Sequence, residues 1–209
     1  MTTSQRPRGW HSRGYLPHFD GEAVTQFITF RLADSLPLHV LEGWKQELAQ
    51  QTVPALPEPE YQIELQRRTE RYLDQGAGAR HLQETRVAAL VEKSLYHFDG
   101  ERYRLLCWAI MPNHVHLLLT PRTEHSLTGI MRSLKSYTAH EANKLLKRTG
   151  KFWFEDYFDR YIRDADHYAA VVRYIENNPV KAGLCQAPEE WRYSSAWWRN
   201  RSAVVPTAE

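Results

Sequence analysis

The sequence predicts an α+β fold in which helices pack against an antiparallel sheet, and three features support this. Strand-like alternation of β-branched and aromatic residues appears at 24–32, 103–111 and 114–120. Segments with the apolar spacing of helices lie between these strands and after them. The Pro112-Asn113 turn is so short that the second and third strands should pair as an antiparallel hairpin. Strands and helices in this order are typical of a sheet with helices laid against it.

The helices are expected at about 38–51, 58–75, 83–98, 126–147 and 165–177. Ser126 has the residue type of an N-cap, and Asn178-Pro179 is expected to stop the last helix. The aromatic segment KFWFEDYFDRYIRD, residues 151–164, is expected to contain a further short strand. Its aromatic residues either stack unpaired bases or pack onto the core, and the second interpretation is favoured.

The chain is expected to form one domain with additions at both ends. Residues 1–20 are basic and rich in Pro and Gly, which indicates an N-terminal arm. The domain is expected over 21–185, with a helical insertion at about 38–80 between the first and second strands, and 186–209 form a C-terminal tail. A chain of 209 residues with 42% hydrophobic and 25% charged residues is long enough for a real core.

Composition favours a cytoplasmic protein that is not bound to a membrane. No apolar run approaches the ~20 residues of a membrane-spanning helix, and the amino terminus lacks a secretory signal. Cys107 and Cys185 have no metal-ligand spacing, and a disulfide framework is not expected. The formal charge is only +2, but basic residues gather at 6–18 and 132–151. These clusters suit either a phosphate backbone or a solvated helix face.

His114-Val115-His116 opens a strand that is otherwise apolar. Side chains two residues apart on a strand point to the same face, so the two imidazoles can bind one divalent ion. A third protein ligand and open positions for substrate oxygens are then expected. The alternative is a pair of half-buried histidines with ordinary hydrogen bonds at the end of the sheet.

The helix expected at 126–147 carries Tyr137 and Glu141 as i and i+4 neighbours on one flank of its apolar stripe. If the stripe lies on the sheet, this flank could come close to the histidines. Tyr137 is then the candidate nucleophile, and Glu141 is the candidate third ligand or base. The alternative is a tyrosine that packs its ring and exposes its hydroxyl. The tyrosines that compete for the catalytic role are Tyr157, Tyr161 and Tyr174.

At these residues the chain resembles a known family. WAIMPNHVHLLLTP (108–121) followed by LKSYTAHEANKLL (134–146) is similar to the single-tyrosine HUH transposases of the IS200-like superfamily. Within it, the chain looks most like the REP-associated tyrosine transposases. FWFEDYFDRYIRDADHY (152–168) and YIENNPVKAGL (174–184) also look like that group.

The resemblance implies a ferredoxin-like sheet on which His114 and His116 bind Mg²⁺ or Mn²⁺. Tyr137 would attack a DNA phosphate, leaving a 5′-phosphotyrosine and a free 3′-hydroxyl. Glu141 matches a metal-site position where insertion-sequence enzymes commonly have Gln, which leaves the third ligand open. The implied partner is single-stranded DNA with REP-type hairpins, bound by a monomer or a homodimer. The basic side chains expected to contact this DNA are Arg13, Lys135, Lys144, Arg160 and Arg163.

Two other functions fit the same residues. A nucleic-acid regulator of this fold would bind hairpins without cutting them. A metallohydrolase would use the ion to activate water, and its cleavage would depend on His114 and His116 but not on Tyr137.

Overall fold

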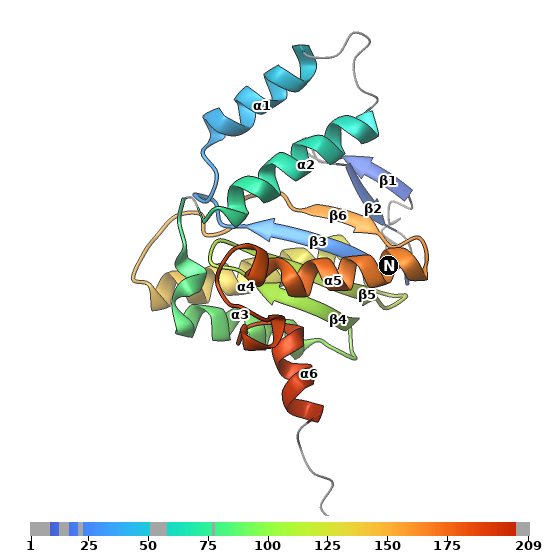
Figure 1. Ribbon diagram of the computed structural model, residues 1–209, viewed down its shortest axis with the longest axis vertical. Coiled ribbons are helices and arrows are strands. Elements are labelled where there is room, and N and C mark those ends of the chain that lie inside the picture. Colours follow the sequence, from blue (N-terminus) through green and yellow to red (C-terminus); the bar gives the residue numbers. More distant parts are fainter. Residues whose placement is uncertain (1–8, 13–16, 21–22, 51–57, 77, 204–209) are drawn as a thin grey trace, which may run out of the picture.

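The computed structural model describes residues 9–12, 17–20, 23–50, 58–76 and 78–203. Its centre is a four-stranded antiparallel sheet in the order β4-β5-β3-β6 (Figure 1). The strands of this sheet are β3 (Gln26–Arg31), β4 (Tyr103–Ile110), β5 (His114–Pro121) and β6 (Phe158–Tyr161). The α-helices are α1 (Leu38–Gln50), α2 (Glu58–Asp74), α3 (Thr85–His97), α4 (Leu127–Leu145), α5 (Ala165–Lys181) and α6 (Ser195–Ala203).

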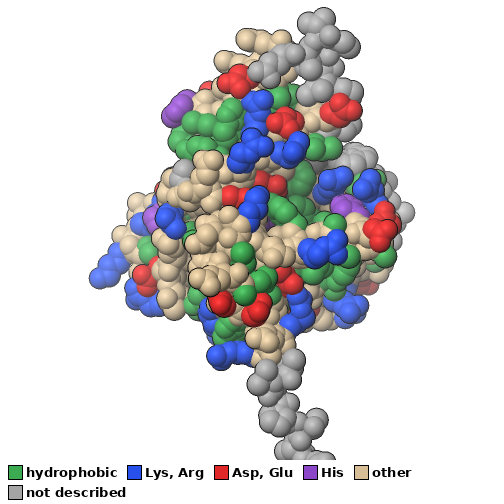
Figure 2. Space-filling model, in the orientation of Figure 1, with side chains coloured by type: hydrophobic (Ala, Val, Ile, Leu, Met, Phe, Trp, Pro, Cys, Tyr) green, Lys and Arg blue, Asp and Glu red, His purple; other side chains and the backbone are tan. Residues whose placement is uncertain are grey.

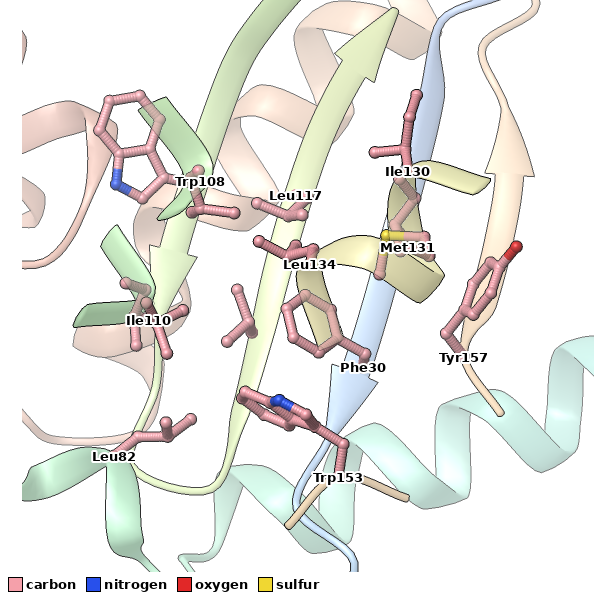
Figure 3. Packing of buried hydrophobic residues seen from close by; sticks show 14 of the residues in the cluster. Phe30, Leu82, Trp108, Ile110, Leu117, Ile130, Met131, Leu134, Trp153 and Tyr157 are labelled. Atoms are coloured by element: carbon pink, nitrogen blue, oxygen red, sulfur yellow. The ribbon is translucent and has the colours of Figure 1, made fainter. Parts of the chain in front are cut away.

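The predicted α+β class and ferredoxin-like sheet are confirmed. The order β3-α3-β4-β5-α4-β6 places the first strand between the third and the fourth, with every neighbouring pair antiparallel. The helices α3 and α4 pack on one face of this sheet, and the main core lies beneath them (Figure 3). The aromatic segment contributes Phe152, Trp153 and Tyr157 to that core, which supports the packing interpretation of these side chains.

The opposite face of the sheet is covered by α5, which lies in front of the strands in Figure 1 while α4 lies behind them. Alternation along β5 divides its residues between the two faces: Val115 and Leu117 point toward α4, whereas Leu118 joins the cluster under α5. Both faces of β5 are therefore apolar, and the strand is buried along almost its whole length.

The helices α1 and α2 lie between the first and second strands of the sheet in the chain, and they have a small apolar cluster of their own. The end of α2 is held against the start of β5, because Asn113 Nδ2 donates to the carbonyl of Leu73 over 3.1 Å. Gly78 has φ +75°, and a Cβ there would lie 2.5 Å from the carbonyl oxygen of Ser35. Only glycine allows this close approach, which returns the chain to the end of β3.

Three segments differ from the predictions. Within the expected arm, β1 (Gly9–Ser12) and β2 (Pro17–Asp20) pair as an antiparallel hairpin. The tail contains a 3₁₀ turn (Pro188–Glu190) and α6, and its Ser194 forms a β-bridge with Ala109. Helix α5 passes its expected stop and continues through Pro179 to Lys181. The proline lies in the last turn, so it removes a single backbone hydrogen bond and leaves the helix before it intact.

Among the residues described, no helix has both the length and the apolarity to cross a bilayer.

Candidate active site

Strand β5 presents both histidines to the face of the sheet that α5 covers. His114 and His116 point the same way, while Val115 between them points into the core under α4. Neither imidazole has exposed surface. Their Nε2 atoms lie 3.0 Å apart, which allows both nitrogens to face one ion.

Each histidine uses its Nδ1 atom for a hydrogen bond that fixes the ring. His114 Nδ1 lies 2.7 Å from Asn113 Oδ1, and His116 Nδ1 lies 2.8 Å from Thr29 Oγ1. Because an amide oxygen only accepts, His114 donates from Nδ1 and keeps the lone pair on Nε2. Burial lowers the pKa of His114 to about 3. Burial, together with His114 and Lys181, also holds the pKa of His116 well below its usual value. Both rings are therefore neutral at pH 7, the state in which imidazole binds metals.

Asp74, the last residue of α2, brings a carboxylate to the histidines. Its Oδ1 lies 3.9 Å from His114 Nε2, and one donor atom from each of Asp74, His114 and His116 fits within 4.8 Å of the others. Oδ1 is buried and has no hydrogen-bond partner in the described part of the protein. The other oxygen, Oδ2, accepts from Lys181 Nζ over 2.8 Å.

This group fits a divalent cation. A buried carboxylate oxygen without a partner is costly, and a cation would satisfy it together with the two imidazole lone pairs. Two histidines and one carboxylate leave other coordination positions open for substrate oxygens. The donor set suits Mn²⁺ and, through its carboxylate, Mg²⁺.

The structure does not bring Tyr137 and Glu141 to this site, contrary to the spatial prediction. The predicted apolar stripe of α4 is buried, but it packs on the face of the sheet opposite the histidines. The Tyr137 side chain is 57% exposed there and lines a pocket between α3 and α4. Glu141 accepts from Lys144 over 2.8 Å and lies outside the group of possible metal ligands.

The tyrosine that does meet the histidines is Tyr174 on α5. Its ring centroid lies 5.4 Å from that of His116, at an interplanar angle of 71°. Burial raises the pKa of its phenol, and the nearby carboxyl groups of Glu70 and Asp74 raise it further. The phenol is thus protonated at neutral pH in this arrangement. A bound cation would favour the phenolate instead.

Asn178 lies one helical turn after Tyr174, so both face the site from α5. Asn178 is buried, and its amide oxygen is a further candidate ligand beside the three donor atoms of the histidine–aspartate group. Glu70 lies one turn before Asp74 on α2, and burial raises the pKa of its carboxyl. A raised pKa makes the carboxylate a stronger proton acceptor.

The basic residues expected to bind DNA are divided between the two faces. Lys135 donates from α4 to the carbonyls of Glu155 and Asp156 over 2.8 and 3.3 Å, so it links this helix to the segment before β6. Lys144 pairs with Glu141 on the same helix. Figure 2 shows lysine and arginine side chains at several places on the face that carries α5, with acidic side chains between them.

Two of the expected DNA-binding residues lie near the histidine face, and a third cannot be placed. Arg160 is opposite Phe27 in the sheet register, and the Phe27 ring stacks on His116. Arg163 is exposed just before α5 begins. Arg13 falls outside the described residues.

The residues that sequence reasoning missed as site members are Asp74, Asn178 and Thr29, whereas Tyr174 was named there only as a competing tyrosine. The segment YIENNPVKAGL carried a usable signal, since it holds a tyrosine and an asparagine at i and i+4 with a lysine three residues further on. Asp74 had no such signal, because α2 is rich in acidic residues of similar spacing.

The sequence is similar to those of known transposases. Residues 82–178 match the family model for IS200-like transposases. A Haemophilus influenzae protein classed with the REP-associated tyrosine transposases is 28% identical over 156 residues, which cover 70% of this chain and 83% of the relative. The REP-associated tyrosine transposase of Escherichia coli K12 is 27% identical over 94 residues, or 44% of this chain and 54% of the relative.

A solved structure shares the fold. It is a REP-associated tyrosine transposase bound to a REP hairpin, and it superposes with a TM-score of 0.55 at 16% identity. The match covers 90% of this chain and 86% of the solved one.

Proposed function

Because residues 82–178 of this chain match the family model for IS200-like transposases and the curated relatives carry the same activity in their names, we propose that the protein cuts and rejoins single-stranded DNA through Tyr174. The observation that carries the proposal is the packing of the Tyr174 ring against His116, on the same face of the sheet as the histidine–aspartate group. The substrate is single-stranded DNA with a hairpin. The relatives named for REP elements and the hairpin complex of a protein with this fold support that choice.

His114, His116 and Asp74 would hold the ion, and Asn178 lies on α5 beside Tyr174 as a further candidate ligand. When bound, a divalent cation neutralises charge on the non-bridging oxygens of the phosphate and favours the phenolate. Thr29 and Asn113 fix the two imidazole rings through their Nδ1 atoms.

The covalent step exchanges one phosphate ester for another. Tyr174 Oη forms a bond to phosphorus, and the bond from phosphorus to the 3′ oxygen of the preceding nucleotide breaks. The phenol proton passes to a base, a role that we assign to Glu70, and the departing 3′ oxygen gains a proton. The DNA is left with a free 3′-hydroxyl, and its 5′ phosphate is joined to Tyr174. Attack by a 3′-hydroxyl on this ester reverses the step and rejoins a strand without a nucleotide cofactor.

The buried site requires a movement before DNA can enter. His114 and His116 have no exposed surface, and they lie beneath the end of α2 and the middle of α5. The ion pair between Lys181 and Asp74 joins these two helices directly. Separation of α2 from α5 would open a path to the histidines.

The covalent adduct tests this function. A hairpin-bearing single strand, labelled at its 3′ end so that the 5′-phosphotyrosine fragment carries the label, is incubated with Mg²⁺ or Mn²⁺ and run on a denaturing gel. The native protein is expected to give a labelled protein band. Tyr174→Phe should abolish this band, while Tyr137→Phe, the matched control on the opposite face, should retain it.

The other outcomes identify the rival functions. Loss of the adduct in Tyr137→Phe but not in Tyr174→Phe would return the nucleophile to α4. Cleavage without any adduct, surviving in Tyr174→Phe, would indicate a metal-activated water. Hairpin binding without cleavage under either metal would indicate a regulator.

A further inference from the structure

Arg31 is the last residue of β3, and it lies directly opposite His114 in the β3–β5 register. The next pair in the same register and on the same face is Thr29 and His116, which are hydrogen bonded to each other. Opposite residues of an antiparallel pair have Cβ atoms about 4.5–5.5 Å apart. The Arg31 side chain therefore starts beside the metal-binding histidines.

Among the described residues, the buried guanidinium of Arg31 has no acidic partner. The residue is 6% exposed, and its central carbon stacks 3.7 Å from the ring centroid of Phe154. Nη1 donates to the carbonyl of Leu32 over 3.3 Å, whereas the buried Nη2 has no hydrogen-bond partner and no carboxylate within ion-pair distance in the described part of the chain. Burial lowers the pKa of Arg31 to about 10, so the group remains charged at neutral pH.

A cavity of about 60 Å³ lies against this guanidinium. The cavity runs beneath α2 from Leu73 to Leu65, and Leu73 is the neighbour of Asp74 in the chain. Thr29 and Arg31 on β3 line its opposite side. One water needs only about 10–15 Å³ by this measure, so the cavity has room for the oxygens of a larger group. Its polar lining side chains are Thr29, Arg31, Lys45, Gln66, Thr69, Asp156 and Tyr157. The one carboxylate among them, Asp156, already accepts from the backbone of Tyr157 through Oδ1.

We propose that Arg31 binds a phosphate of the DNA strand next to the one that is cut, an inference that takes its substrate from the proposed function. A buried arginine without an anion is costly, and a phosphate supplies the missing charge and the acceptor for Nη2. The planar guanidinium also matches two phosphate oxygens at once. The cavity adjoins the metal site through Thr29, so a strand whose scissile phosphate faces the histidines can continue toward Arg31.

The test replaces single phosphates in a hairpin oligonucleotide with uncharged methylphosphonate and measures binding by fluorescence anisotropy in EDTA, where binding is read without cleavage. The proteins compared are the native chain, Arg31→Met and Arg31→Lys. Arg102→Met is the matched control, because Arg102 also stacks on a phenyl ring, that of Phe98, but belongs to the opposite face.

One phosphate position beside the cleavage site is expected to matter. In the native chain, methylphosphonate there should weaken binding about ten-fold, as loss of a charged hydrogen bond does. Arg31→Met should bind the unmodified strand about ten-fold more weakly and show no further loss at that position. The slope of log affinity against log salt concentration should become less steep by about 0.7, since one phosphate contact is lost. Arg31→Lys should recover part of the loss, and Arg102→Met should match the native profile.

The inference would be overturned if Arg31→Met still lost affinity at the same phosphate position as the native chain when that phosphate is replaced by methylphosphonate. So would an even loss at all positions with a lower melting temperature, which would indicate a structural arginine above a water-filled cavity. The adduct experiment separates the two proposals. If the native chain forms the adduct but Arg31→Met shows the same loss of affinity at each modified phosphate as the native chain, only the phosphate site is contradicted. If the loss at one phosphate depends on Arg31 but no adduct forms, only the cleavage reaction is contradicted.

Discussion

The phenol ring of Tyr174 packs edge-on against the imidazole of His116, with 5.4 Å between the ring centroids. This contact joins two elements that are nearly 60 residues apart in sequence, and it follows from packing α5 on the face of the sheet to which the even-numbered residues of β5 point. Helix α4, with Tyr137, occupies the other face. The choice between the two tyrosines is thus a choice between two sides of one strand.

Asp74→Asn should weaken Mn²⁺ binding by about 100-fold. Loss of a residue that only orients a ligand costs up to about 100-fold, and Asp74 is proposed as a direct ligand. The change removes the charge of the carboxylate beside His114 and keeps its shape. Isothermal titration calorimetry measures the affinity directly, without DNA. The matched control is Glu141→Gln, which alters the ligand expected from sequence and should bind Mn²⁺ like the native chain. Weak binding in the control with normal binding in Asp74→Asn would restore Glu141 as the third ligand.

Thr29→Val should lower Mn²⁺ affinity by about 10-fold, because it removes the hydrogen bond that orients His116 through Nδ1. Valine has nearly the shape of threonine, so the effect isolates the hydroxyl. Thr29→Ser keeps the hydroxyl and should retain most of the affinity. Equal affinities for the native chain and Thr29→Val would show that packing alone holds the ring.

Much of the fold was predictable from local patterns. The hairpin of β4 and β5 followed from the Pro112-Asn113 turn, and the shared face of the histidines followed from strand alternation. The apolar stripe of α4 was also predicted, from Leu127 through Ile130 and Leu134 onward. These features depend on neighbours in sequence, so one sequence suffices to find them.

The face on which α4 packs was not predictable from those patterns. Leu117 and Leu118 point to opposite faces of β5, and both are fully buried. An apolar stripe can therefore be buried on either side of this strand, and the stripe alone does not say which. The role of Asp74 was hidden for a different reason. It reaches the site only because α2 is folded back beside β5, a long-range contact without a local signature.

Lys135 should make stability rise with pH in alkaline solution. Burial lowers the pKa of its ammonium to about 8, so below pH 8 the group is charged in both states and its burial opposes folding. Between pH 8 and about 10.4 the unfolded chain still holds the proton that the folded chain has lost, and stability increases. Solvent screening reduces the gain to on the order of 1 kcal/mol.

Urea unfolding at pH 7, 8, 9 and 10 measures this contribution when the native chain is compared with Lys135→Met. From pH 7 to pH 10, the unfolding free energy of the native chain should rise relative to that of Lys135→Met. Lys151→Met is the control, since Lys151 is exposed and pairs with Glu155 near the same segment. A difference that stays constant from pH 7 to pH 10 would contradict the lowered pKa.

Glu92→Gln should loosen the C-terminal segment from α3. The buried Glu92 carboxylate accepts from Arg192 Nη1 at 3.0 and 3.1 Å and from Trp198 Nε1 at 2.9 Å. Glutamine keeps one acceptor oxygen and replaces the other with an amide NH₂ that cannot accept, so at least one of the three hydrogen bonds is lost and the rest lose the charge. Because Arg192 is partly exposed, it regains water, and the expected loss of unfolding free energy is about 1–2 kcal/mol. Hydrogen exchange in α6 should accelerate, while exchange in β5 should change little. The exposed Glu189 serves as the control, as Glu189→Gln should leave both rates unaltered. If exchange accelerates equally in α6 and β5, the C-terminal segment is part of the cooperative core, and the separate anchoring through Glu92 is wrong.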